Sequence, residues 1–357
     1  MDIVAATAQY ERWLGSKLPL VAEDLELKHR RMAKSPFRFL RATYYRWAQN
    51  FADDLPLELA NAPRLIAVGD LHTENFGTWI DREGRLTWGM NDLDEIDALP
   101  YTNDLLRLAT SAILAIREDR LPIKERAACR ALLSGYRQCI DDGGHPIVIA
   151  ERHEWLRGLY SQTAKDATAW WAKISALEPI GEPVPQAALE LLAASSPGAG
   201  WQPRLHRRVA GLGSLGRRRV FACGEWRGGL TARELKQTAW PTGLWLDHPA
   251  SPGRLRGPTR PDDRTRKQLG WTARRLAPDC VKLRLGDYTK GHSIRLLTAM
   301  GFETGNIHLC SPVRAVQGVR DHLRDLDLYL FEAVAAELAR KTRSDWKAWR
   351  AHIQKSA

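Results

Sequence analysis

The chain has 357 residues, of which 44% are apolar and 27% charged, and it carries a formal net charge of +11. These ordinary globular values exclude collagen-like, fully disordered and disulfide-scaffold proteins. No apolar run is long enough for a membrane span, so no membrane partner is expected. The basic balance favours anionic partners such as nucleotide phosphates or nucleic acid, and the length suggests two or three domains or lobes.

Five scattered cysteines without a Cys-x-x-Cys pair favour reduced thiols and a cytoplasmic location over disulfides or a structural zinc site. The first residues have no basic segment before an apolar stretch, so no signal peptide is expected.

Shifts in composition divide the chain into five regions. A cluster of prolines, glycines and serines predicts a linker between a helical lobe and a strand-rich lobe. The predicted regions are an N-terminal helical segment (1–62), a lobe with a hairpin and helices (63–178), the linker (179–203), a strand-rich lobe (204–290) and a C-terminal helical region (291–357).

Local patterns predict elements inside these regions. Residues 65–68 form a short apolar run typical of a buried strand, and residues 78–88 predict a β-hairpin. Asn103-Asp104 is expected to cap a helix that continues to about residue 117 with one apolar face, and Pro122 is expected in the first turn of the next helix. Apolar spacing predicts a single helix near 319–341.

The most informative stretch is the loop between the apolar strand and the hairpin. Asn75 comes just before the first hairpin strand and Asp92 just after the second, and these two ends of an antiparallel pair are neighbours. Asp70 lies on the same loop, five residues before Asn75. Converging amide and carboxylate oxygens suit Mg²⁺, which takes one or two protein ligands beside phosphates.

An Asp, an Asn five residues later, a hairpin and a further Asp is the layout of kinase-type phosphotransferases. In that layout Asp70 accepts the proton of the attacking hydroxyl, while Asn75 and Asp92 hold the metal with Asp94 as a helper. His72 is a second candidate for catalysis. A structural role, with the imidazole hydrogen-bonded to the loop backbone, is equally consistent with the sequence. The loop resembles the Gly-Asp-Leu-His-x-x-Asn loop of aminoglycoside-phosphotransferase-like kinases.

A Gly-x-Gly-x-x-Gly sequence occupies residues 211–216. A Rossmann fingerprint would need a helix after the glycines, whereas here a strand is predicted, followed by another strand that ends near Lys236. This order is typical of a kinase nucleotide-binding lobe. An ordinary Gly hairpin and a surface lysine are the alternatives. The residues expected to contact the ATP phosphates are Gly211, Gly213, Ser214, Gly216 and Lys236.

The order of these parts differs from that of a standard kinase, in which the Gly loop precedes the catalytic loop. Circular permutation and an unrelated second domain are two explanations of this order. No Glu is identified as the partner of Lys236. The expected fold is α+β, with two protein-kinase-like lobes.

Several segments together resemble the bacterial domain of unknown function 2252 family across nearly the full length. The resemblance implies a kinase-like fold and supplies no substrate. The segments that carry it are 32–41, 69–77, 91–95, 99–105, the Gly loop and 301–308.

The expected function is Mg²⁺-dependent, ATP-using phosphate transfer to an unknown hydroxyl acceptor, either a small molecule or a protein. A metal-dependent phosphoesterase is an alternative, because Gly69–His72 resembles the Asp-x-His opening of calcineurin-like phosphatases and 305–308 loosely echoes their Gly-Asn-His. Two further alternatives are a non-catalytic nucleotide-binding protein and a nucleic-acid-binding protein that uses the arginine runs at 204–208 and 217–219.

Overall fold

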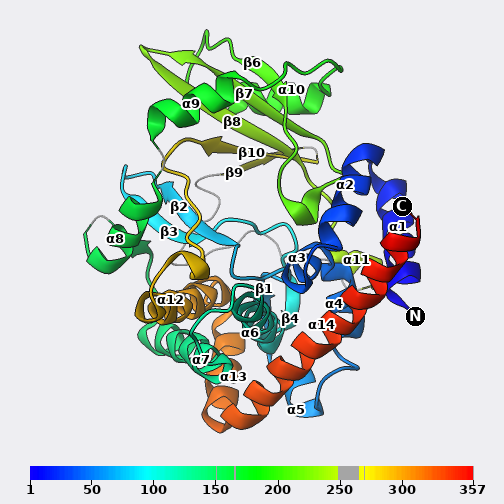
Figure 1. Ribbon diagram of the computed structural model, residues 1–357. Helices are drawn as coiled ribbons and strands as arrows, with labels where there is room; N and C mark the ends of the chain where they lie inside the picture. The colour runs from blue at the N-terminus through cyan, green and yellow to red at the C-terminus, as the bar shows by residue number, and fades with distance from the viewer. Residues whose placement is uncertain (150, 165, 248–264, 269, 357) are drawn as a thin grey trace.

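The computed structural model describes residues 1–149, 151–164, 166–247, 265–268 and 270–356. It is an α+β protein in which a five-stranded sheet lies above a body made mostly of helices (Figure 1). The predicted α+β class is therefore confirmed. The predicted region 204–290 includes residues 248–264, which lie outside the described residues.

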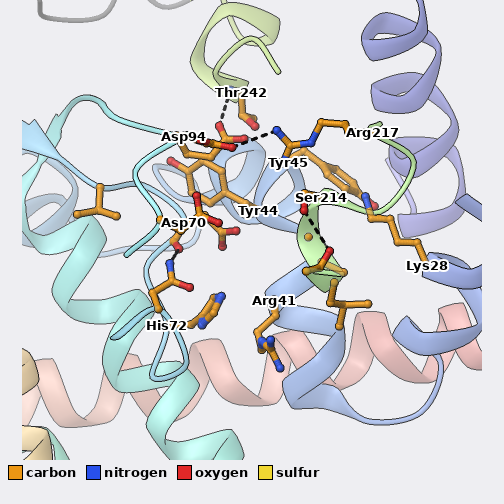
Figure 2. A pocket seen from close by; sticks show the side chains of 18 of the residues that line it. Lys28, Arg41, Tyr44, Tyr45, Asp70, His72, Asp94, Ser214, Arg217 and Thr242 are labelled. Carbon is orange, nitrogen blue, oxygen red and sulfur yellow. Dashed lines mark hydrogen bonds and ion pairs between the residues drawn. The ribbon is translucent and has the colours of Figure 1, made fainter. Parts of the chain in front are cut away.

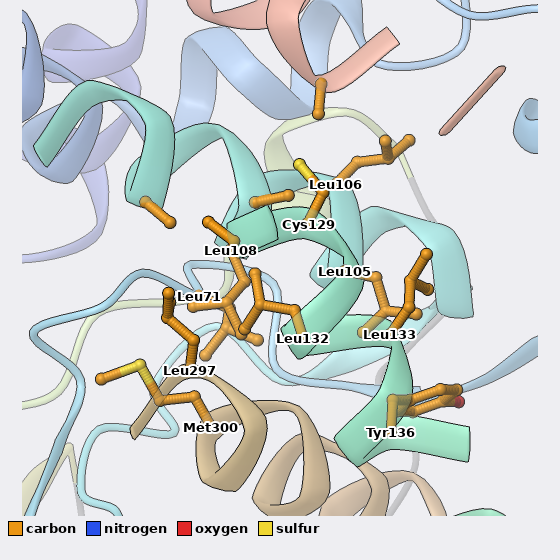
Figure 3. Packing of buried hydrophobic residues seen from close by; sticks show 14 of the residues in the cluster. Leu71, Leu105, Leu106, Leu108, Cys129, Leu132, Leu133, Tyr136, Leu297 and Met300 are labelled. Carbon is orange, nitrogen blue, oxygen red and sulfur yellow. The ribbon is translucent and has the colours of Figure 1, made fainter. Parts of the chain in front are cut away.

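A helix buried on every side forms the centre of the helical body. This helix, α6 (Tyr101–Glu118), is buried from its first residue to Ile116, because α7 (Glu125–Asp142), α12 (Lys290–His308) and α14 (Leu328–Ser356) surround it. Figure 3 shows side chains of α6, α7 and α12 meeting in this core. The backbones of α7 and α12 approach so closely that a Cβ on Gly301 would lie 2.0 Å from a carbonyl oxygen of α7. Only glycine fits there.

Two small sheets lie between the helical body and the large sheet. Strand β1 (Arg64–Ala67) pairs antiparallel with β4 (Asp97–Pro100). The predicted hairpin is confirmed as β2 (Phe76–Ile80) and β3 (Leu86–Met90), and β3 also pairs with the short strand β5 (Ile147–Val148). The hairpin therefore begins directly after the Asp70 loop and ends directly before Asn91.

The five-stranded antiparallel sheet has the order β6-β7-β8-β10-β9. Side chains alternate between its faces, as in any strand: Val220 and Ala222 pack with α10 (Gln186–Ala194), while Phe221 and Cys223 pack with α9 (Ala167–Ser175). Helix α10 lies within the predicted linker. The strands are β6 (Arg204–Arg207), β7 (Arg219–Trp226), β8 (Gly229–Gln237), β9 (Thr265–Gln268) and β10 (Trp271–Leu276).

The first 60 residues form short helices that reach the large sheet's loops. Leu212 and Leu215, at the Gly loop, are buried in one cluster with Ile3 and with Trp349 of α14. The N-terminal segment therefore packs on both the C-terminal helix and the Gly loop. Its helices are α1 (Ile3–Lys17), α2 (Ala22–Met32), α3 (Pro36–Ala42), α4 (Tyr44–Asn50) and α5 (Leu57–Ala60).

The prediction of one helix over residues 319–341 is wrong, because the chain breaks between α13 (Val313–Asp325) and α14. Leu326 adopts an extended backbone with ψ 115°. The Asp327 side chain then accepts a hydrogen bond from the Tyr329 N–H at 2.7 Å, which satisfies a donor in the first turn of α14. The apolar spacing continues across this break, so periodicity alone does not reveal it.

Two predicted helix starts are also corrected. Asn103 and Asp104 lie inside the first turn of α6, which makes no side-chain cap hydrogen bond, and Asp104 is used elsewhere. Helix α7 begins at Glu125, so Pro122 precedes the helix instead of lying in its first turn. The remaining elements are α8 (Glu154–Thr163), α11 (Thr242–Trp245), η1 (Leu212–Ser214) and η3 (Leu285–Asp287).

All five cysteines carry free thiols, and four of them are buried. Within the residues that the structure describes, no helix has the length and apolar character needed to cross a membrane.

Candidate functional site

Asp104 holds the loop that follows β1. Its carboxylate is fully buried and accepts hydrogen bonds from the backbone N–H groups of Val68 at 2.6 Å and Gly69 at 3.0 Å. His308 of α12 contacts the same carboxylate through Nε2 at 3.0 Å. Gly69 has φ 78°, and a Cβ there would lie 2.5 Å from the Glu95 carbonyl oxygen. The loop that carries Asp70 is therefore fixed by buried charge and by close backbone contact.

Asp70 is paired with an arginine that the sequence did not single out. Arg107 of α6 donates from Nε and Nη2 to Oδ1 of Asp70, at 3.2 and 2.5 Å. The other oxygen, Oδ2, lies toward the Gly loop, since a Cβ built on Gly213 would be 3.6 Å from it. Burial raises the pKa of the Asp70 carboxyl, although Arg107 opposes the shift. The carboxylate is thus held at one oxygen and available to a ligand at the other.

His72 is buried inside the loop. Its Nδ1 accepts a hydrogen bond from the Glu74 backbone N–H at 3.2 Å, and burial lowers the pKa of the imidazole well below its ordinary value. A neutral ring with a backbone partner corresponds to the alternative that the sequence left open for His72.

Asn75 and the end of the hairpin are neighbours, as the antiparallel register requires. Phe76 pairs with Met90, and the Asn91 N–H donates to the Asn75 carbonyl oxygen at 2.8 Å. Asp92 follows at the next position. The Asn75 side chain donates from Nδ2 to the Asp70 carbonyl oxygen at 2.6 Å, so Oδ1 is the amide oxygen suited to a metal.

Lys236 links the large sheet to the hairpin. Its ammonium lies 3.2 Å from Oδ1 of Asp92 and 2.5 Å from Oδ2 of Asp94. Arg217, from the end of the Gly loop, contacts the same Asp94 oxygen at 3.2 Å. The carboxylates expected to hold metal therefore pair with two cations from the other lobe, although these residues are more than a hundred positions apart.

The Gly loop connects β6 to β7 and contains the short helix η1. Ser214 Oγ donates to the Gly211 carbonyl oxygen at 3.1 Å and accepts from Nη2 of Arg219 at 2.5 Å. Arg219 in turn contacts the fully buried Glu234 at 2.8 Å. Arg208 and Arg274 contact Glu234 as well, and together these charges lower its pKa against the opposing effect of burial. The loop is therefore anchored through Ser214 to a buried charge cluster.

These parts border one pocket between the large sheet's loops and the helical body. Figure 2 shows Asp70, Asp94, Ser214 and Arg217 around it, with Lys28 on its opposite side. Lys236 and Gly216 do not line the pocket directly, although Lys236 contacts Asp92 and Asp94 at its border. The sequence-predicted residues that line it are Asp70, His72, Asn75, Asp92, Asp94, Gly211, Gly213 and Ser214.

Glu95 adds a second titratable carboxyl to the pocket. Its Oε2 accepts a hydrogen bond from the Thr242 N–H at 2.7 Å, and burial raises the pKa of the carboxyl to about 7. The nearby Asp70 charge raises it further, while Arg217 opposes the shift. Glu95 therefore changes its charge in the neutral pH range.

The N-terminal helices supply the rest of the pocket wall. No catalytic motif in residues 1–62 indicated this, because their basic residues resemble a solvated surface. Arg107 was missed for the same reason, since an arginine inside a buried helix is rare. The pocket residues that sequence reasoning missed include Tyr10, Lys28, Arg41, Tyr44, Tyr45 and Lys282.

Several residues on which the two alternative functions depend make contacts inside the protein. Arg217 and Arg219 form ion pairs with Asp94 and Glu234, and their side chains are 10% and 4% exposed. Asn306 and His308 are fully buried on α12, and His308 contacts Asp104. Glu303 of α12 is also buried and accepts a hydrogen bond from the Met90 N–H at 3.0 Å.

The predicted metal ligands that line the pocket are oxygen donors. Among the described residues, no three His, Cys, Asp or Glu side chains are placed to hold a metal ion. Asp92, Asp94 and the amide oxygen of Asn75 offer two carboxylates and one neutral oxygen, which is typical of Mg²⁺ sites completed by phosphates and water.

Residues 20–170 match the profile of a family described as "Uncharacterized protein conserved in bacteria (DUF2252)". The match includes the Asp70 loop, the hairpin and Asp92, and it ends before the Gly loop. This part of the chain is similar to that family. No curated protein and no solved structure matches the chain, so the expected resemblance to kinases finds no support in these comparisons.

Proposed function

We propose that this protein is a Mg²⁺-dependent phosphotransferase that moves the γ-phosphate of ATP to a hydroxyl acceptor. The observation that carries the proposal is the contact of Lys236 with Asp92 at 3.2 Å. A kinase-type site needs a lysine after a Gly loop and a metal-binding Asp after a hairpin to meet in one place. The support is that Lys236 and Asp92 meet although they are 144 positions apart in the sequence.

The proposed fold is a kinase-like two-lobed fold in which the nucleotide-binding lobe follows the catalytic lobe in sequence. The support is the order β6, Gly loop, β7, β8 with Lys236 near the end of β8. Circular permutation explains why this lobe, residues 204–290, follows the catalytic loop instead of preceding it.

Asn75 and Asp92 would hold Mg²⁺, assisted by Asp94, and the ion would neutralise charge on the nucleotide phosphates. Gly211, Gly213, Ser214 and Gly216 would lie over those phosphates. Lys236, now paired with Asp92 and Asp94, would exchange these carboxylates for phosphate oxygens when nucleotide binds. Asp92 and Asp94 would then be available to hold the ion.

The transfer itself assigns one task to Asp70. The acceptor oxygen bonds to the γ-phosphorus, the bond from that phosphorus to the bridging oxygen of ADP breaks, and the hydroxyl proton passes to Oδ2 of Asp70. Arg107 keeps the carboxylate in position through Oδ1. His72, bonded to the loop backbone, supports the loop. Positioning and charge neutralisation supply most of the rate in such reactions.

Two variants test the proposal. Asp92→Ala should abolish binding of Mg²⁺ with a non-hydrolysable ATP analogue, measured by calorimetry. Asp70→Ala should bind the analogue like the wild type and lose ADP formation from ATP. Asp119→Ala, an exposed position at the end of α6, is the matched control. Wild-type binding by Asp92→Ala, or a wild-type ADP rate in Asp70→Ala, would overturn the assignment.

A further inference from the structure

The pocket wall opposite Asp70 is built by three N-terminal helices. Tyr10 of α1 and Tyr45 of α4 stack with ring centroids 4.4 Å apart, and both are buried. Lys28 of α2 lies beside them, with its ammonium 5.7 Å from the Tyr45 ring centroid. All three side chains line the pocket, and Figure 2 shows Lys28 directed toward Tyr45 and Ser214.

Lys28 is only 3% exposed, and among the described residues its ammonium has no carboxylate within ion-pair distance. Glu11, the carboxylate that most favours the charged form of Lys28, is bonded to His29 at 2.8 Å. Burial lowers the pKa of Lys28. A buried cation without an anionic partner is unfavourable for folding, so its retention in a pocket wall points to a ligand.

Three other cations in or beside the pocket have carboxylates of their own, and Lys282, next to the Asp70 loop, donates to the Glu74 carbonyl oxygen at 2.8 Å. Arg217 contacts Asp94 at 3.2 Å, Arg41 contacts Glu74 at 2.9 Å, and Lys236 contacts Asp92 and Asp94. On the pocket wall opposite Asp70, Lys28 is therefore the cation whose charge a ligand can neutralise. The two tyrosine rings beside it offer flat surfaces for a small organic body.

We propose that Lys28 binds an oxyanion group of the acceptor while Tyr10 and Tyr45 contact its organic body, so that the substrate is a small hydroxylated anion carrying a carboxylate or a phosphate ester. This inference rests on the proposed function, because it names the acceptor class for the same pocket. The size is limited, because the N-terminal helices close this side of the pocket: the Val21 N–H donates to the Gly216 carbonyl oxygen at 2.8 Å and ties the Gly loop to α2.

The test is calorimetry on the full chain without nucleotide, with three probes: inorganic phosphate, D-glycerate and uncharged glycerol. The wild type should bind at least one anionic probe more tightly than glycerol. Lys28→Met should weaken binding of that anion by about tenfold or more, and Lys28→Arg should retain it. Lys34→Met, at an exposed lysine just after α2, should behave like the wild type.

The probes separate the two sources of the oxyanion. Loss of glycerate binding alone in Lys28→Met assigns a carboxylate, and loss of phosphate binding alone assigns a phosphate ester. The inference is overturned if the wild type binds neither anion, or if Lys28→Met binds both like the wild type.

Stability and nucleotide binding complete the design. Lys28→Met should raise the melting temperature, because methionine fills the same space without a buried charge. A lower melting temperature with unchanged anion binding would identify a purely structural lysine and overturn the inference. Lys28→Gln replaces the methionine variant if that chain does not fold. Binding of the Mg²⁺-bound ATP analogue should be unchanged in Lys28→Met, so a failure of the acceptor site is distinguished from a failure of the nucleotide site.

Discussion

Arg107 and Asp70 form a forked contact in which two guanidinium nitrogens donate to one carboxylate oxygen, at 3.2 and 2.5 Å. Arg107 is 1% exposed at its side chain and also donates to the Leu40 carbonyl oxygen at 2.8 Å. Its guanidinium lies over the Tyr44 ring, 5.0 Å from the centroid. The orientation of Asp70 is thus determined by a residue on the central helix.

Arg107→Lys should lower turnover and spare nucleotide binding. A lysine cannot reproduce the planar fork, and misplacement of a reacting group by about 1 Å can cost about a hundredfold in rate. The weaker charge contact should also raise the pKa of Asp70 further. Because the base acts when deprotonated, the rising limb of the pH–rate profile should move to higher pH. Arg343→Lys, exposed on α14, should leave both the rate and the profile unchanged.

Asp104→Asn should destabilise the protein by about 2–4 kcal/mol. The Asp104 carboxylate accepts hydrogen bonds from two backbone N–H groups and contacts His308. The asparagine side chain has one acceptor oxygen, and its NH₂ group would face a donor and leave it without a hydrogen bond. Urea unfolding measures the loss. Asp119→Asn, exposed at the end of the same helix, should be neutral, and equal stability of the two variants would contradict the role given to Asp104.

Glu95→Gln should change how stability depends on pH. Burial raises the pKa of Glu95 from the ordinary value of 4.5 to about 7, so the folded state holds this proton more tightly than the unfolded state. The associated stabilisation is complete below the unfolded value and is lost as the pH rises through about 7. Between pH 5 and 8 the wild type should therefore lose about 1–3 kcal/mol relative to Glu95→Gln.

Urea unfolding at several pH values measures that difference. Glu118→Gln, at an exposed position at the end of α6, is the control and should follow the wild type at each pH. Parallel stability curves for the wild type and Glu95→Gln would show that Glu95 does not titrate in this range.

Gly213→Ala should disturb the Gly loop. A Cβ at this position would lie 2.9 Å from the Arg41 carbonyl oxygen, so the loop must move away from α3 or the protein must lose stability, by about 1 kcal/mol or more. Binding of the ATP analogue should weaken, since the loop backbone can no longer occupy the same place. Gly181→Ala, where a Cβ meets nothing within 4 Å, should bind normally.

Short-range patterns in the sequence were enough to predict the hairpin and the approach of Asn75 to its far end. Both follow from strand alternation and antiparallel pairing, which are local rules. The order of the motifs suggested that Lys236 and Asp92 share one site. Only the packing of the two lobes brings these residues into contact. No local rule pairs residues 144 positions apart.

The sequence could not reveal residues whose environment is set by tertiary packing alone. Arg107 and Lys28 are charged residues on helices, and such residues usually face water. Only the burial of α6, and of α2 against the Gly loop, turns them toward the pocket. The break at Asp327 was missed for a related reason, because one polar residue that starts a new helix does not interrupt the apolar spacing on either side.

The burial of Leu212 and Leu215 against the first helices has a practical consequence for anyone trimming the chain. A fragment beginning at residue 63 would expose these two leucines to solvent, and we expect such a fragment to aggregate in vitro. It would also lack Lys28 and Tyr45. Recombinant work on this protein should therefore retain its first sixty residues, even though no catalytic motif marks them.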